Sequence, residues 1–338
     1  MSDDWMIQAR GLRRTFTAGK ETIEAVRDVT FDVATGELLA LLGPNGAGKS
    51  TTLRMLTTLL PPTAGTVRIA GVDAVRDPAR VRESIGYVGQ KNAVGENHRI
   101  RDELVTQGRC YGLRAHQARR RADELLEILG IADLATRAPG VLSGGQRRRT
   151  DIALGLIHNP AVLFLDEPST GLDPHSRAGL WEQIQLLRRE YGITIVLTTH
   201  YLDEADQMAE RVVIIDQGRV IADGTADGLK AGLGGDWIHV TTGDTDGARV
   251  AARVADRMAG VREVTTDGHT VSARISDAEA ALPGYLRLLD HESVTVARAA
   301  VRRPSLDDVF IGLTGRAIQA SGHAYESATD APTGETHV

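Results

Sequence analysis

The residues best suited to chemistry form a glycine-rich loop, Gly43-Pro44-Asn45-Gly46-Ala47-Gly48-Lys49-Ser50-Thr51, which fits the phosphate-binding pattern G-x-x-x-x-G-K-[ST]. A triphosphate must be surrounded by backbone N–H groups, so such a loop needs glycines that tolerate positive φ and allow a close approach. A helix expected over 51–60 would direct its positive N-terminal end at the anion. Lys49 would then reach the β- and γ-phosphates, and the Ser50 hydroxyl would bind Mg²⁺. By itself the pattern predicts a nucleotide-binding P-loop protein and nothing narrower.

A second candidate site lies where an apolar run ends in two carboxylates. The run Leu163-Phe164-Leu165 predicts a buried strand that ends at Asp166 and Glu167. Asp166 would hold Mg²⁺ through water, because Mg²⁺ gives up its hydration shell reluctantly. Glu167 would lie beside the γ-phosphate and polarise or deprotonate the attacking water. An acidic pair at a strand end is usually structural, but its place after a phosphate loop favours the catalytic interpretation.

A third segment, Leu142-Ser143-Gly144-Gly145-Gln146, precedes a helix expected from about residue 147 to 158. With this segment the chain resembles the ATP-binding-cassette (ABC) ATPases, because the LSGGQ signature is that family's own. The resemblance covers about residues 6–227 and includes every other element of the family. Each short piece alone has an ordinary structural interpretation, but six pieces in the family's order make coincidence negligible. The resemblance implies ATP and Mg²⁺ as cofactors.

The resemblance also assigns roles to single residues elsewhere in the chain. Gln90 corresponds to the Q-loop glutamine, a ligand of Mg²⁺, although a glutamine after a strand is most often a surface residue. Asp173 corresponds to the D-loop aspartate, and His200 to the switch histidine that hydrogen-bonds the γ-phosphate. Phe16 falls where the family keeps an aromatic residue against adenine, unless it is simply part of the core. The catalytic candidates are then Lys49, Glu167 and His200.

The signature segment implies a dimer. Ser143 and the amides of Gly144 and Gly145 lie at a helix N-terminus, which is a second anion site. They are too far along the fold to reach the chain's own phosphate loop, and in the family they cover the γ-phosphate of the opposite subunit. Two chains would therefore close head-to-tail around two ATP molecules and reopen after hydrolysis. Gln90 would transmit this closing and reopening to the helical region 101–142. In the family, the membrane permease, which is a separate chain, docks on that region.

The elements that position these residues follow from periodicity. Residues 6–35 alternate apolar and polar side chains, as half-buried antiparallel strands do. Apolar strands at 162–165 and 193–197, with a helix at 176–190 between them, predict a β-α-β unit of a buried parallel sheet. The remaining expected elements are strands at 38–42, 65–71, 85–88, 212–215 and 218–221, and a helical region over 101–130. Together with the resemblance, they predict an α/β P-loop ABC ATPase with a RecA-like core, an antiparallel β subdomain and a helical subdomain.

The composition changes after Gly224, and residues 230–235 have the sequence of a linker. Beyond it, the order β-α-β-β-α-β over 237–299 predicts a small ferredoxin-like α+β module, closed by a helix at 305–313. The predicted divisions are an ATPase domain at 6–228, an accessory or regulatory domain at 236–316 and a disordered tail at 317–338, whose composition is polar.

Composition limits the setting in which the chain works. The 338 residues are 42% hydrophobic and 25% charged, in the range of soluble globular proteins, and the net charge of −6 gives no attraction to nucleic acid. We expect no signal peptide, since the acidic N-terminus leads into no apolar stretch. No run approaches the ~18 apolar residues of a membrane span, and the resemblance to the ABC ATPases implies a peripheral protein at the cytoplasmic face of the membrane. Cys110, the one cysteine, excludes an internal disulfide and is expected to be a small buried apolar residue.

Several stretches are similar to the drug-exporter ATPases of the daunorubicin-resistance type, whose permeases are separate chains. They are residues 43–55, 164–177, 199–206 and 304–315, and the last extends the resemblance to residues 6–316. The implied function is ATP-driven export of a hydrophobic compound, a drug, an antibiotic or a lipid-like molecule. Thr150 departs from the usual aliphatic residue, which would loosen the packing of its helix, and the polar stretch 92–101 lacks the family's typical sequence.

The alternative is a non-transport ABC ATPase. Those that act on DNA carry long coiled coils between the Q-loop and the signature, and those that act on the ribosome carry two cassettes and basic linkers. The interval 90–142 is too short for such coils, and this chain has one cassette and an acidic balance. A purely regulatory module without catalysis is opposed by Glu167 and His200.

Overall fold

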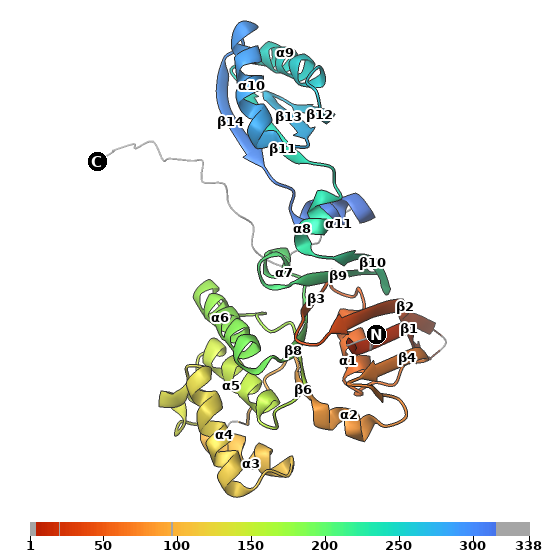
Figure 1. The fold of residues 1–338 in the computed structure, drawn as a ribbon, viewed down its shortest axis with the longest axis vertical. Helices are drawn as coiled ribbons and strands as arrows, with labels where there is room; N and C mark the ends of the chain where they lie inside the picture. Colours follow the sequence, from red (N-terminus) through yellow and green to blue (C-terminus); the bar gives the residue numbers. More distant parts are fainter. Residues whose placement is uncertain (1–4, 20, 96, 316–338) are drawn as a thin grey trace, which may run out of the picture.

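The computed structural model describes residues 5–19, 21–95 and 97–315 (Figure 1). Within these residues a ten-stranded sheet has the order β5-β4-β1-β2-β10-β9-β3-β8-β7-β6. Its strands are β1 (Trp5–Ala18), β2 (Glu21–Ala34), β3 (Leu38–Leu42), β4 (Ala64–Ile69), β5 (Val72–Asp73), β6 (Ile85–Val88), β7 (Val162–Asp166), β8 (Thr194–Thr199), β9 (Arg211–Asp216) and β10 (Arg219–Gly224).

The sheet combines a parallel and an antiparallel part. β3 pairs in parallel with β8 and β9, and β7 pairs in parallel with β6 and β8. Every residue of β3, β7 and β8 is buried, as expected for strands covered on both faces. β1 pairs antiparallel with β2 and β4. The predicted α/β core with an antiparallel β part is therefore confirmed.

Among the described residues, the part of the chain that forms this sheet also contains eight α-helices: α1 (Lys49–Leu56), α2 (Pro78–Ser84), α3 (Ile100–Cys110), α4 (Ala115–Ile128), α5 (Gly144–Leu156), α6 (Pro174–Tyr191), α7 (Leu202–Met208) and α8 (Ala226–Ala231). Helices α3 to α6 lie on one side of the strands, and α1 lies with β1, β2 and β4 on the other (Figure 1). Two short 3-10 helices, Ala132–Leu134 and Pro139–Val141, connect α4 to α5.

Several expected boundaries are wrong for local reasons. The helix expected to reach residue 60 ends at Leu56, because Thr58, just beyond the C-cap Thr57, has a left-handed φ of +60° that does not continue an α-helix. The helical region 101–130 divides into α3 and α4 at Gly112, which has a φ of +87°. The predicted linker 230–235 begins inside α8, whose N-cap Thr225 accepts a hydrogen bond from the Gly228 amide at 3.0 Å.

The C-terminal part forms its own four-stranded antiparallel sheet, in the order β12-β13-β11-β14. Its elements follow the predicted β-α-β-β-α-β sequence: β11 (Asp236–Thr242), α9 (Thr245–Asp256), β12 (Val261–Asp267), β13 (Thr270–Ile275), α10 (Ala278–His291) and β14 (Val296–Arg302). β14 lies three residues beyond the strand predicted at 293–299. The apolar faces of the sheet and of its two helices meet in a separate core that contains Val240, Ala251 and Tyr285.

The last helix, α11 (Leu306–Thr314), does not close this module, and that expectation is wrong. Its buried side chains Leu306, Val309 and Phe310 belong to the core that continues through α5, α6 and β8. α11 contacts α7 and α8. Figure 1 shows α11 beside α8, below the four-stranded sheet. The chain therefore leaves the ATPase region after α8, forms the four-stranded module and returns to the ATPase region at α11.

One smaller expectation is wrong. Cys110 is exposed rather than buried, because it ends α3 on the solvent side. Thr150 is fully buried, and its hydroxyl donates to the carbonyl of Gln146 at 3.0 Å; that it loosens the packing of its helix stays a prediction. The described residues include no helix that is both long and apolar enough to cross a bilayer. The predicted disordered tail 317–338 lies outside the described residues.

Candidate active site

The phosphate loop joins the buried end of β3 to the first turn of α1. Gly46 and Gly48 have φ of +80° and +104°, which side chains with a Cβ rarely adopt. A Cβ on Gly48 would lie 2.6 Å from the backbone oxygen of Ala25, and a Cβ on Gly43 would lie 2.1 Å from that of Ile215. The glycines are thus required by the close packing of the loop on β2 and β9 as well as by its shape.

The Lys49 side chain folds back over this loop. Its Nζ donates to the carbonyls of Gly43 and Pro44 at 2.7 and 3.0 Å and lies 3.7 Å from Oε1 of Glu167. Burial lowers the pKa of Lys49, and the charges of Glu167 and Asp166 oppose that shift. A buried ammonium group is therefore held at the loop where a phosphate would lie.

Asp166 ends β7 as a completely buried carboxylate. Its Oδ1 accepts hydrogen bonds from the hydroxyls of Ser50 at 2.8 Å and Thr198 at 2.7 Å. Among the described residues Oδ2 has no hydrogen-bond partner. A buried carboxylate oxygen left without a donor, beside a serine hydroxyl, fits a hard cation with oxygen ligands such as Mg²⁺.

Glu167 occupies a backbone conformation with a φ of +46°, unusual for a residue with a side chain. Its amide donates to Thr198 Oγ1 at 2.9 Å, which orients the carboxylate toward the loop. Oε1 lies 3.3 Å from Nδ1 of His200, and Oε2 accepts from the Thr170 hydroxyl at 3.2 Å. The close contact with His200 is the largest cause that lowers the pKa of Glu167, the charges of His200 and Lys49 add to it, and burial opposes it.

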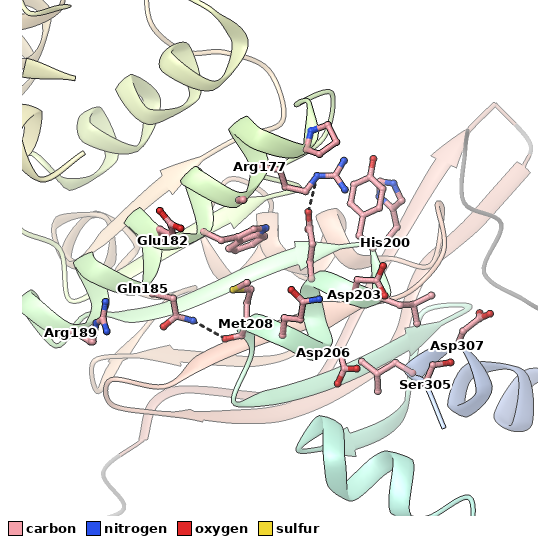
Figure 2. A pocket seen from close by; sticks show the side chains of 18 residues that line it. Arg177, Glu182, Gln185, Arg189, His200, Asp203, Asp206, Met208, Ser305 and Asp307 are labelled. Carbon is pink, nitrogen blue, oxygen red and sulfur yellow. Dashed lines mark hydrogen bonds and ion pairs between the residues drawn. The ribbon is translucent and has the colours of Figure 1, made fainter. Parts of the chain in front are cut away.

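His200 follows β8 and is buried to 7% exposure. The turn that carries it is fixed by Thr199, whose hydroxyl accepts from the Tyr201 amide and donates to Glu204 Oε2, both at 3.0 Å. On the other side of His200 lies a cavity of about 900 Å³ between α6, α7 and the start of α11 (Figure 2). Figure 2 shows Ser305 and Asp307 at one end of this cavity and Arg177 near His200. The helix that returns from the C-terminal module thus lines a cavity shared with the switch histidine.

The signature segment lies elsewhere on the molecule. Ser143 caps α5, where its hydroxyl accepts from the Gln146 amide at 3.3 Å and its own amide donates to Gln146 Oε1 at 3.0 Å. A Cβ on Gly145 would lie 2.9 Å from the Ser176 Cβ, so this glycine lets α5 approach α6. α5 and α1 lie on opposite sides of the central strands (Figure 1). Ser143, Gly144, Gly145 and Gln146 are therefore not brought to the phosphate loop of the same chain.

The other predicted site residues are also outside the cluster. Gln90 is exposed directly after β6. Phe16 is 38% exposed on β1, with the Arg14 guanidinium carbon 4.9 Å from the centre of its ring. Asp173 caps α6 by accepting from the Ser176 amide and hydroxyl at 2.9 and 2.6 Å. The structure thus brings together five predicted residues: Lys49, Ser50, Asp166, Glu167 and His200.

Two residues that sequence reasoning missed hold the site together. Thr198 bonds both Asp166 and the Glu167 amide. Arg148 donates to the backbone carbonyls on either side of Glu167. The only sequence signal for Thr198 is its place in a strand that ends at His200, and Arg148 is hidden in a run of three arginines.

Comparisons with known proteins agree with this geometry. Residues 26–170 match the family model "ABC transporter", and residues 224–314 match "ATP-binding protein DrrA1-3-like, C-terminal domain". The daunorubicin resistance ATP-binding protein DrrA3 of Streptomyces coeruleorubidus is 46% identical over 86% of this chain and 92% of its own length. The doxorubicin resistance ATP-binding protein DrrA of Mycobacterium tuberculosis is 41% identical over 93% and 95%.

The linearmycin resistance ATP-binding protein LnrL of Bacillus subtilis is 36% identical over 93% of this chain and all of its own length. Among solved structures, the dimeric post-hydrolysis state of the ATP-binding cassette MJ0796 with ADP and Pi covers 65% of this chain and 98% of its own, with 27% identity and a TM-score of 0.60. The DrrA3, DrrA and LnrL relatives are named for resistance, and the matched family model is that of ABC transporters. Together these matches favour transport over an ABC ATPase that acts on nucleic acid or the ribosome.

Proposed function

The chain belongs to the ABC transporter ATP-binding proteins of the daunorubicin-resistance type, and from this membership we propose how its site works. It is an ATPase that powers export as one subunit of a transporter. Two copies would close head-to-tail on two ATP molecules, each copy covering the nucleotide of the other. The observation that carries this proposal is the cluster in which Lys49 and His200 lie 3.7 and 3.3 Å from the same oxygen of Glu167.

In this cluster each side chain has a separate task. Lys49 would exchange its two carbonyl partners for the β- and γ-phosphates. Mg²⁺, held by Ser50, Asp166 and Gln90, would supply neutralisation of the phosphate charge. Glu167 is kept ionised by its lowered pKa, so it can accept a hydrogen bond or a proton from the attacking water. His200 would fix the carboxylate and contact the γ-phosphate.

The rest of the nucleotide site would be built by backbone and by the second chain. The phosphate loop would be formed by Gly43, Pro44, Asn45, Gly46, Ala47, Gly48 and Thr51, and each of these except Pro44 has an amide hydrogen to offer. Phe16 would stack on adenine. The exposed N-terminus of α5, with Ser143, Gly144, Gly145 and Gln146, would cover the γ-phosphate held by the other copy. Asp173 would lie at the contact between the two copies.

A groove of about 340 Å³ suggests where the membrane permease docks. It lies between β6, α3 and α5 and is lined by Tyr87, Ala93, Tyr111 and Leu154 among others. The Tyr111 ring stacks on His158 at 3.9 Å between centroids, which gives the groove one aromatic wall. Because the segment after Gln90 borders this groove, a change at the nucleotide can reach the permease there. Such docking would place the protein at the cytoplasmic face of the membrane.

The substrate class follows from the relatives. Their names refer to daunorubicin, doxorubicin and linearmycin, and we propose an apolar antibiotic or another hydrophobic compound as the cargo. We also propose an ATPase domain at 6–228 and an accessory domain at 236–316, whose last helix α11 packs back on the ATPase domain. The accessory domain would stabilise the dimer or regulate it. No nucleic acid is expected as a partner.

Reconstitution tests this function. The chain is purified with the permease encoded by a neighbouring reading frame and placed in lipid vesicles. Candidate antibiotics are expected to raise ATP hydrolysis several-fold over the rate without compound, and to enter inside-out vesicles only when ATP and Mg²⁺ are present. Wild-type hydrolysis by a strictly monomeric chain would contradict the two-copy site. Uptake that does not depend on ATP would contradict the transport role.

A further inference from the structure

Arg148 is a buried arginine whose donors are used by backbone carbonyls. It lies on α5, two residues after Gln146, and is 4% exposed. Nη1 donates to the carbonyl of Gly89 at 2.6 Å, Nε to that of Pro168 at 2.9 Å and Nη2 to that of Asp166 at 3.1 Å. One side chain therefore joins three segments of the chain that are far apart in sequence.

The three carbonyls that Arg148 binds lie beside two residues of the predicted site, Glu167 and Gln90. Asp166 and Pro168 are the two neighbours of Glu167, whose φ of +46° is held only if its surroundings restrain it. Arg148 restrains the carbonyl on each side of Glu167, while Thr198 restrains its amide. Gly89, the third carbonyl partner, directly precedes Gln90. The guanidinium group thus contacts the backbone directly beside both residues that are expected to respond to the γ-phosphate.

The chemistry of the site requires an arginine. Burial lowers the pKa of Arg148, and the charges of Asp151 and Asp166 oppose that shift. A guanidinium presents several donors in a fixed plane and can bond three carbonyls at once, whereas a lysine is a single point donor. Asp151, three residues further along α5, accepts from the amides of Ala93 and Val94, both at 2.9 Å. The same face of α5 therefore holds both ends of the segment around Gln90.

We propose that Arg148 is a positioning residue that ties α5 to the turn of Glu167 and to the segment of Gln90. The N-terminus of α5 carries Ser143. When that end closes over the partner's nucleotide, the displacement of α5 would reach the chain's own Glu167 through Arg148. This second step rests on the two-copy site proposed above, whereas the support of Glu167 by Arg148 does not.

The first test separates catalysis from nucleotide binding. Arg148→Lys and Arg148→Gln are each expected to bind a fluorescent ATP analogue with unchanged affinity and to lower kcat about 100-fold, since small displacements of a catalytic group have effects of that size. Arg147→Gln is the matched control: Arg147 lies beside Arg148 and is half-buried, and it donates to the Pro139 carbonyl, away from Glu167. Its kcat should change less than about twofold.

Two results would overturn the proposal. One is wild-type kcat in both variants of Arg148. The other is loss of nucleotide binding in both, because the arginine would then support the fold or the phosphate loop rather than the turn of Glu167. The glutamine variant keeps the test decisive if the lysine variant does not fold, since it leaves no charge to bury.

A double variant tests whether Arg148 acts through Glu167. The residual rate of Arg148→Lys combined with Glu167→Gln should equal that of Glu167→Gln alone, because the group that Arg148 positions is already removed. A further loss of about 100-fold would contradict the proposal. If Glu167→Gln forms no ATP-dependent dimer, the two-copy site fails, but the kcat of the Arg148 variants still decides their role.

Discussion

Nδ1 of His200 lies 3.3 Å from Oε1 of Glu167. This contact joins the end of β8 to the end of β7, two neighbouring parallel strands. It is the main reason why the pKa of Glu167 is below its ordinary value. The carboxylate that is expected to accept a proton from the attacking water therefore stays ionised to lower pH than an ordinary glutamate, through a contact with a residue from another strand.

The first prediction concerns pH. In His200→Ala the largest cause that lowers the Glu167 pKa is removed, so that pKa should rise toward its ordinary value of 4.5. The acidic limb of the residual kcat, where Glu167 becomes protonated, should then move to higher pH. A pH–rate profile of both proteins measures this shift. His116→Ala, an exposed histidine of α4, is the control and should keep the wild-type profile. An unchanged acidic limb in His200→Ala would show that the contact does not lower the pKa of Glu167.

The second prediction concerns Glu167 itself. Glu167→Gln keeps the size of the side chain and its contact with Thr170 but cannot accept a proton. ATP binding should persist, while turnover should fall between about 10² and 10⁴-fold, the usual contribution of a general base. Because the γ-phosphate is then not removed, size-exclusion chromatography with ATP and Mg²⁺ should show a stable dimer. Turnover at the wild-type rate would remove Glu167 from the role assigned to it.

The third prediction tests the covering of one nucleotide by the other copy. Ser143→Arg places a large cation at the exposed N-terminus of α5, where the partner's γ-phosphate would lie. Binding of a fluorescent ATP analogue should be unchanged, and hydrolysis should fall about 100-fold. Thr245→Arg adds the same charge at an exposed site on α9 and should have no effect. Loss of nucleotide binding in Ser143→Arg would argue that the signature segment serves its own chain.

The fourth prediction concerns α11. Phe310 is fully buried in the core shared with α5 and α6, so Phe310→Ala should lower the free energy of unfolding by about 3–5 kcal/mol. Leu313 lies on the same helix but is 51% exposed, and Leu313→Ala should change that free energy by less than about 0.5 kcal/mol. Denaturant unfolding followed by fluorescence of the ATPase region compares the two. Equal effects would mean that α11 is not anchored in this core.

Much of the site could be predicted because its signals are local. Lys49 lies in a loop whose glycines are required by its backbone shape, and Asp166 ends an apolar strand that can only be buried. Thr198 and Arg148 could not be predicted in the same way. Their partners lie far away in sequence, and neither a threonine in a strand nor an arginine in a basic run shows which carbonyl or carboxylate it will meet.

In the fold, too, features with local sequence signals could be predicted and contacts between distant segments could not. Alternation and apolar runs predicted the strands, including the parallel β-α-β unit of β7, α6 and β8 and the order of elements in the C-terminal module. A helix was also predicted at 305–313, and in the structure Leu306, Val309 and Phe310 form its buried apolar face. An apolar face indicates that a helix will be buried, but not against which element. The helix packs on α7 and α8 instead of the module that precedes it.

The return of α11 makes the four-stranded module an insertion rather than an appendage. It is attached at two points, α8 and α11, and both attachments rest on the ATPase region. A premature stop or a protease cut near Pro304 would leave every residue of the predicted nucleotide site in the polypeptide. It would also expose the apolar surface of the ATPase region that Leu306 and Phe310 normally cover. Such a shortened polypeptide should aggregate and be degraded rapidly, although its phosphate loop is intact.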